Sequence, residues 1–165
     1  MKVKSAAIPA QGAGRRPASA PALVSAAAIL GLAIGASYST LRAQSRSVWD
    51  GVYTEEQANR GEPLYNQHCA SCHGDRLTGG ESAPPLAGGE FLANWDGLTV
   101  GDLFERTRKT MPQNKPGKLS REVNANILVY MLSVNGFPAG ETELPHNTER
   151  LKQIRIEATQ PDRKK

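Results

Sequence analysis

The stretch Cys69-Ala70-Ser71-Cys72-His73 contains both cysteines of this 165-residue chain. Two thiols three positions apart, followed directly by an imidazole, form the C-x-x-C-H pattern of covalent c-type haem attachment. Each thiol can bond one vinyl group of the same haem as a thioether, and the adjacent imidazole is then held under the iron. The stretch therefore predicts one covalently bound haem c, attached through Cys69 and Cys72, with His73 as the proximal iron ligand.

Three other interpretations compete with haem attachment. A thioredoxin-like redox pair needs a βαβ context, and the sequence shows no strand pattern of convincing length. Half a zinc site lacks a second pair of ligands. A plain structural disulfide is the third alternative. We favour haem, because the N-terminus independently predicts export, and bacteria attach haem c outside the cytoplasm.

The N-terminal segment has the order of a secretory signal. An uncharged run from residue 17 to residue 41 has an apolar centre and a polar exit, and it follows a basic stretch that holds Lys2, Lys4, Arg15 and Arg16. We therefore predict a signal peptide over residues 1–43, cleaved after Ala43, and a periplasmic location. The same run is nearly long enough to span a bilayer, so an uncleaved membrane anchor is the alternative.

The charge distribution argues against nucleic-acid binding. The net charge is +4, but residues 1–43 carry five basic and no acidic side chains, so the remainder is slightly acidic. A nucleic-acid partner therefore loses its electrostatic support.

Two cysteines also exclude a disulfide-rich scaffold. Aromatic residues make up only 5% of the chain, so a small core needs further apolar material, which a porphyrin would supply.

Capping and periodicity predict three helices between residues 49 and 138. Thr54 caps the first, in which Gly61, Leu64, Tyr65 and His68 share one face and Pro63 introduces a kink. Two further helices have caps and apolar faces of their own. One begins at Thr99 with a face of Val100, Leu103 and Phe104, and the other begins at Ser120 with a face of Ile127, Tyr130, Met131 and Val134 and ends at Asn135-Gly136.

Residues 74–97, between the first two helices, are rich in glycine and proline and are expected to form a long loop. Residues 139–165 form a polar tail, in which Leu151, Ile154 and Ile156 support either a short helix or a docking strand. We therefore predict an all-α domain over residues 44–138, with its helices packed around the haem.

The sixth iron position has one favoured ligand. Met111 lies in a loop directly before Pro112 and has no helical face to fill, so we expect it to be the distal ligand. Met131 lies on an apolar helix face, where core packing is its better role. His146, His68 and an open sixth position are the alternatives.

These features resemble the class I c-type cytochromes, particularly the small bacterial periplasmic type that serves quinoprotein dehydrogenases. The resemblance covers Trp49 to about Pro138. Its parts are the Gly61-x-x-x-Tyr65 helix, the Cys69 to His73 motif with Gly74, the loop from Pro84 to Gly88, Met111-Pro112 and the helix of Tyr130.

The resemblance implies roles for further residues. The Pro84 carbonyl would accept a hydrogen bond from the proximal His73 and orient its ring. Leu86 would pack on the haem face, or serve as an ordinary buried loop leucine. Trp95 would donate its indole N–H to a haem propionate, or act as a core tryptophan. Gly61 and Tyr130 would meet where the first and last helices cross.

The resemblance implies a periplasmic one-electron carrier with His/Met ligation, not an enzyme, serving a dehydrogenase or a respiratory chain. Its partners would be redox proteins, such as a quinoprotein dehydrogenase or a terminal oxidase. A haem peroxidase or gas-binding protein with an open sixth position is the alternative, as is a subunit held in a larger complex by its tail. Basic residues on both sides of Met111, at positions 106, 108, 109, 115 and 118, form either a docking surface for an acidic partner or an ordinary solvated charged face.

Overall fold

The computed structural model describes residues 45–81 and 83–162, and this part of the chain is mostly helical. The predicted signal peptide or anchor over residues 1–43 lies outside the described residues. Within them, no helix is long and apolar enough to cross a membrane. The elements are β1 (Arg46–Ser47), a 3₁₀ turn (Val48–Asp50), α1 (Glu55–His68), α2 (Ala70–His73), α3 (Gly89–Trp95), α4 (Val100–Thr110), α5 (Arg121–Val134), α6 (Thr148–Leu151) and β2 (Ile154–Arg155). The predicted all-α class is confirmed, with only these two short strands added in the described residues.

Helix α1 begins where its cap predicts and runs without interruption past Pro63. The Thr54 side chain accepts a hydrogen bond from the Gln57 amide at 3.2 Å. Pro63 removes one amide donor from the helix, and the carbonyl deprived of it belongs to Asn59. Pro63 and Asn59 are both exposed, so water can hydrogen-bond to that carbonyl. The hydrogen bond that Pro63 removes is therefore lost on the solvent side of the helix.

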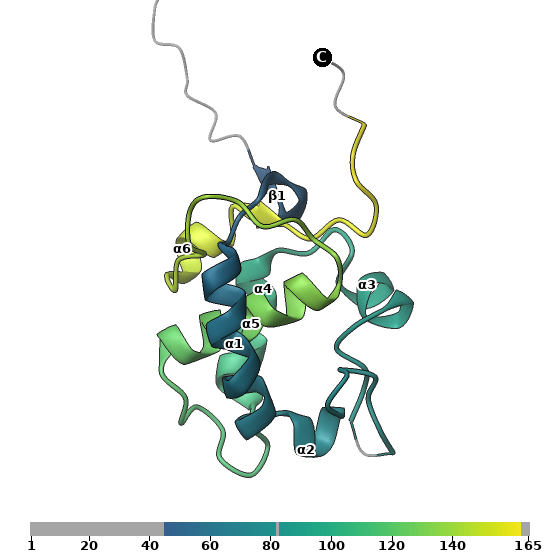
Figure 1. Cartoon of the computed structure of the whole chain (residues 1–165), viewed down its shortest axis with the longest axis vertical. Helices are drawn as coiled ribbons and strands as arrows, with labels where there is room; N and C mark the ends of the chain where they lie inside the picture. The colour runs from purple at the N-terminus through teal and green to yellow at the C-terminus, as the bar shows by residue number, and fades with distance from the viewer. Residues whose placement is uncertain (1–44, 82, 163–165) are drawn as a thin grey trace, which may run out of the picture. The chain divides into compact units, whose positions relative to one another are not determined.

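Helices α1 and α5 cross at very short range at Gly61 (Figure 1). A Cβ atom on Gly61 would lie 2.0 Å from the carbonyl oxygen of Asn126 and 2.9 Å from the Cβ of Tyr130. The Tyr65 ring, one turn further along α1, lies 5.4 Å from the Tyr130 ring. The absence of a side chain at position 61 lets the backbones approach closely, as the family resemblance implies for this pair of helices.

Gly61→Ala is expected to lower the free energy of unfolding by about 2–3 kcal/mol, because the added methyl group has no room against the α5 backbone. Denaturant unfolding of the haem-loaded protein, followed by far-ultraviolet circular dichroism, measures the loss. Gly89→Ala is the matched control, because a Cβ at position 89 meets nothing within 4 Å. Equal stability of the two variants would contradict the close crossing.

Helices α4 and α5 begin at their predicted caps. The Thr99 side chain accepts from the Asp102 amide and the Ser120 side chain from the Val123 amide, each at 3.1 Å. The buried face of α4 is the predicted one. That of α5 is broader than predicted, and Val134 is 42% exposed. The buried residues of α5 are Asn124, Ala125, Asn126, Ile127, Leu128, Val129, Met131 and Leu132.

Helix α3 lies inside the segment predicted as a long loop, so that prediction is wrong at residues 89–95. Phe91 is only 1% exposed, and its ring lies 6.3 Å from that of Trp95. The sequence carries no start signal for this helix, because Gly88 precedes it with φ of +83° and no side chain caps it. Packing of the two aromatic residues stabilises a helix whose local sequence gives no start signal.

The C-terminal segment packs into the core of the domain. Leu151 is fully buried at the end of α6, and Ile154 and Ile156 are 2% and 0% exposed. The segment thus contains both elements that the sequence left as alternatives, a short helix and a strand. Strand β2 pairs in parallel with β1, and the Trp49 indole N–H donates to the Glu157 carbonyl at 2.9 Å. Figure 1 shows this yellow segment beside β1.

Candidate haem site

The C-x-x-C-H motif forms one tight helical turn at the end of α1. The His73 and Cys72 amides both donate to the Cys69 carbonyl, at 3.0 and 3.1 Å. Positions three apart on a helix face the same side, so this turn suits bonds from both thiols to one ligand. Both thiols are free, Cys72 is exposed and Cys69 is half-buried. The two attachment positions are therefore accessible from outside the chain.

Beside them, the His73 imidazole is buried and has a defined tautomer. Its side chain is 7% exposed, and Nδ1 lies 2.8 Å from the Pro84 carbonyl oxygen. A carbonyl can only accept, so Nδ1 carries the proton and donates it to this bond. The lone pair of the neutral ring is then on Nε2, the atom available to a metal. The structure thus contains the contact that the family resemblance implies for Pro84.

A short loop holds the Pro84 carbonyl in place. The Gly79 amide donates to the His73 carbonyl at 2.9 Å, and the Leu86 amide donates to the Leu77 carbonyl at 2.8 Å. Gly79 has φ of +76°, and a Cβ there would lie 2.7 Å from the Pro85 nitrogen. Only glycine fits this position without strain. The loop is therefore folded back tightly against the motif.

Asn135 fixes the other side of this loop, a role that sequence reasoning missed. Its amide nitrogen donates to the carbonyls of Leu86 and Met131, at 3.0 and 2.7 Å, and its side-chain oxygen accepts from the Gly88 amide at 3.0 Å. The sequence shows Asn135 only as a helix-stop signal. Nothing in its local pattern indicates that it bonds to residues 47 and 49 positions earlier.

Asn135→Ala is expected to destabilise the protein by roughly 1–2 kcal/mol, because the loop loses its hydrogen bonds to the end of α5. The Gly88 amide should also exchange with solvent faster, since it loses its acceptor. Hydrogen exchange read by NMR measures both effects. Asn66→Ala, which alters an exposed asparagine of α1, is the control and should leave the Gly88 amide unchanged. Unchanged Gly88 exchange in Asn135→Ala would show that the loop is held by other contacts.

Cys69 lacks the properties of a redox-active thiol. Burial, followed by the neighbouring Cys72, raises the pKa of the Cys69 thiol to about 11. Thioredoxin-like pairs instead need a thiol whose pKa is lowered. Among the described residues, no three histidine, cysteine or acidic side chains converge as they would around a bare metal ion. The site is thus a thiol pair beside an imidazole, the donor set that haem c attachment uses.

Leu86 and Trp95 lie at the edge of the core, each half-buried and packed against it. Leu86 belongs to the loop that Asn135 fixes, and Trp95 ends α3. Both keep apolar surface exposed, which a bound porphyrin would cover. Their packing fits a haem-facing role and an ordinary core role equally, so the two interpretations of each residue remain predictions.

Met111 ends α4 and leads into the loop before α5. Its amide donates to the Thr107 carbonyl at 2.9 Å, and its side chain is half-buried. Met131, by contrast, is 2% exposed in the core. The half-buried side chain leaves Met111 available for ligation, and its pairing with His73 across a haem stays a prediction.

The two other candidate distal ligands occupy different surroundings. His68 is half-buried in the last turn of α1, directly before the motif. His146 is exposed, and its carbonyl accepts a hydrogen bond from Arg121 at 2.8 Å. Both imidazoles stay alternatives to Met111.

Residues 56–131 match the family described as cytochrome c oxidase, cbb3-type, subunit III, a c-type cytochrome domain family. This range of the chain is therefore similar to a c-type cytochrome domain. The matched range contains the motif, Pro84 and Met111, and it ends before the C-terminal segment that packs on the domain. A c-type cytochrome domain functions in haem-based electron transfer, and its cofactor is haem c.

One solved structure with similarity to the cytochrome domain is the sulfane dehydrogenase SoxCD from Paracoccus pantotrophus, with 25% sequence identity and a TM-score of 0.45. The match covers 65% of this chain and 61% of that one, so this chain spans less than two thirds of the relative's length. No curated protein matches the chain.

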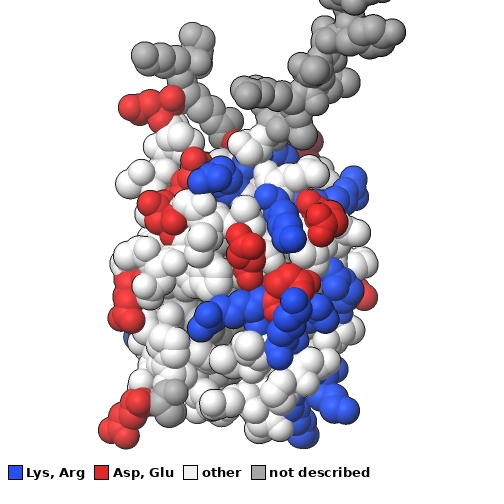
Figure 2. Space-filling model, turned by 180° about the vertical axis from the view of Figure 1, so that it is seen from behind, with Lys and Arg blue, Asp and Glu red and all other residues white. Residues whose placement is uncertain are grey.

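The basic segment around Met111 is less uniformly positive than the sequence suggests. Arg108 and Lys109 each pair with Glu105, at 3.0 Å. Figure 2 shows basic side chains gathered around acidic ones on this face of the molecule. The exposed cations of the segment that form no ion pair with a described residue are Arg106, Lys115 and Lys118. The positive potential is therefore carried mainly by these three.

Proposed function

We propose that this chain is an exported, periplasmic one-electron carrier with one haem c attached covalently to Cys69 and Cys72. In this proposal His73 and Met111 would be the two protein ligands of the iron. The observation that carries it is the buried His73 imidazole, whose Nδ1–H donates to Pro84 and leaves Nε2 for the metal. When bound, haem c supplies an iron that cycles between the ferrous and ferric states.

The chain's own residues prepare the proximal side for this role. The Pro84 carbonyl fixes the orientation of the His73 ring and raises its basicity as a ligand. Gly79 and Asn135 hold the Pro84 loop from two sides, so the position of the Pro84 carbonyl is fixed. A preorganised ligand changes its position little when the iron changes charge. This rigidity favours rapid electron transfer over chemistry on bound substrates.

Two protein ligands would leave no coordination position for a substrate. This is why we propose a carrier rather than a peroxidase or a gas-binding protein. A thioether sulfur opposite histidine also favours the reduced iron and raises the reduction potential. The predicted signal over residues 1–43 supports export, because bacteria attach haem c outside the cytoplasm.

Met111→Ala tests the ligand set. Protein expressed with haem-maturation machinery should be low-spin, show the weak red band of sulfur–ferric ligation and, when reduced, bind no carbon monoxide. The variant should lose that band and bind carbon monoxide, because the sixth position opens. Visible spectra of both oxidation states measure these changes.

Met131→Leu is the matched control for the same experiment, because Met131 is packed in the core and should not ligate iron. A high-spin wild-type spectrum that shifts with carbon monoxide would instead support the open-site alternative. Covalent attachment is checked separately, by whether haem stays with the denatured chain and is lost in Cys69→Ala/Cys72→Ala.

The proposed partners are redox proteins of a dehydrogenase or a respiratory chain, with an acidic docking surface. The support is the cluster of Arg106, Lys115 and Lys118 near Met111, which gives this side of the domain a positive potential.

Lys115→Gln/Lys118→Gln should slow oxidation of the reduced protein by the anion ferricyanide by about threefold to tenfold at low salt, because steering is lost. Oxidation by the cation hexaammineruthenium(III) should become faster. Both effects should fade near 1 M salt, where screening is strong. Stopped-flow absorbance measures the rates, and Lys152→Gln, which removes a lysine paired with Glu149, is the control. Equal rates for the double variant and the wild type would refute docking at this cluster.

A further inference from the structure

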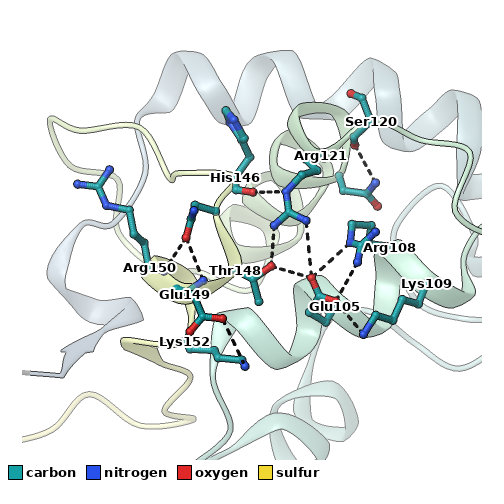
Figure 3. A network of polar contacts seen from close by, with 12 residues as sticks. Glu105, Arg108, Lys109, Ser120, Arg121, His146, Thr148, Glu149, Arg150 and Lys152 are labelled. Atoms are coloured by element: carbon teal, nitrogen blue, oxygen red, sulfur yellow. Dashed lines mark hydrogen bonds and ion pairs between the residues drawn. The ribbon is translucent and has the colours of Figure 1, made fainter.

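The segment that carries Met111 is attached at both ends near one carboxylate, that of Glu105. The segment leaves α4 at Met111 and enters α5 at Arg121. Figure 3 shows side chains from both helices and from the C-terminal segment converging on Glu105. Residues 113–118, in the middle of the segment, are all exposed. The ends of the segment are therefore where tertiary contacts can fix its position.

On the α4 side, Glu105 holds the last turn of the helix. Arg108 donates to it through Nε at 3.3 Å and through its terminal nitrogen at 3.0 Å. Lys109 Nζ lies 3.0 Å from the same carboxylate. These pairs stand three and four residues apart, the spacing at which helical side chains meet. They stabilise the turn from which Met111 emerges.

On the α5 side, Arg121 connects the other end of the segment to the same group. One terminal nitrogen lies 3.9 Å from Glu105, and the other donates to the Thr148 hydroxyl at 2.6 Å. Thr148 in turn donates to Glu105 at 2.7 Å. The guanidinium also lies 5.0 Å from the centre of the Phe104 ring. Arg121 therefore has little freedom to move away from α4.

The Glu105 carboxylate is well suited to this role because it is partly shielded and fully ionised. Its side chain is 20% exposed. Hydrogen bonds from Arg108, then Thr148 and Lys109, lower its pKa to about 2. Partial burial reduces screening of its ion pairs by water and salt, so they are stronger than those of exposed surface pairs.

We infer that Glu105 is a positioning residue for the distal ligand, holding both ends of the 111–120 segment so that Met111 stays on the iron. Thr148 extends this hold to the C-terminal segment, which thereby contributes to closing the sixth position from outside the family-matched domain. The inference rests on the proposed Met111 ligation. Loss of the Glu105 charge would free the ends of the segment, and Met111 would then leave the iron more readily.

Imidazole binding to the ferric protein tests this inference, because imidazole must displace the distal ligand. Glu105→Gln should raise the apparent affinity for imidazole roughly fivefold, with loss of the sulfur–ferric band at lower imidazole concentration. Glu149→Gln is the matched control, because Glu149 lies on α6, is 80% exposed and, among the described residues, forms an ion pair with Lys152 alone, at 3.8 Å. Equal affinities of the two variants would overturn the inference.

Hydrogen exchange gives a readout that does not depend on the iron. Glu105→Gln should speed amide exchange in residues 112–119 and leave α1 at the wild-type rate. Thr148→Val, which removes only the bridging hydroxyl, should have the same effect to a smaller degree, and it serves if Glu105→Gln fails to fold. Faster exchange throughout α1 and α5 would show a general stabilising role and overturn the inference.

The two proposals fail in different ways. If the wild-type ferric protein binds imidazole with no sulfur–ferric band to lose, Met111 is not the ligand and the proposed ligand set fails. If the wild type has the band and Glu105→Gln behaves as Glu149→Gln does, the ligand set stands and the positioning role of Glu105 fails.

Discussion

The close crossing of α1 and α5 at Gly61 is the constraint on which the rest of the domain depends. It brings the carbonyl of Asn126 to within 2.0 Å of where a side chain on Gly61 would begin. Helix α1 leads directly into the C-x-x-C-H turn, so the crossing fixes the position of His73. Helix α5 supplies the groups that hold the segments on either side of the site.

The two ends of α5 serve different segments. Asn135, at its C-terminal end, holds the loop whose Pro84 carbonyl accepts a hydrogen bond from His73. Arg121, at its first position, joins the network that holds the segment of Met111. A single helix thus links the two predicted ligand segments mechanically, because displacement at its packing against α1 would reach both of them.

The sequence was most informative where the signals are local. The caps at Thr54, Thr99 and Ser120 set the starts of the long helices, and the motif set the chemistry of the site. The His73–Pro84 contact was also anticipated, although only through the family resemblance. These features depend on residues close together in the chain or on a pattern with fixed spacing.

The features that escaped prediction depend on long-range contacts. Helix α3 has no capping side chain and is stabilised by packing of Phe91, so nothing local indicated it. The sequence indicates Asn135 only as a helix stop, and it indicates no role for Glu105. Their partners lie up to 49 residues away for Asn135 and 43 for Glu105, distances over which a single sequence carries no pairing signal.

The pairing of β1 with β2 joins a segment that is made early in synthesis to one that is made much later. Trp49 and its acceptor Glu157 are 108 residues apart, and the ribosome makes the first long before the second. The small parallel sheet therefore closes only after residues 154 and 155 have been made. A chain cut short before residue 153 keeps the whole haem-attachment motif, but the Arg46 amide and the Trp49 indole lose their acceptors, the carbonyls of Gln153 and Glu157. Residues 153–157 thus hold the start of the described domain in place from a segment far along the chain.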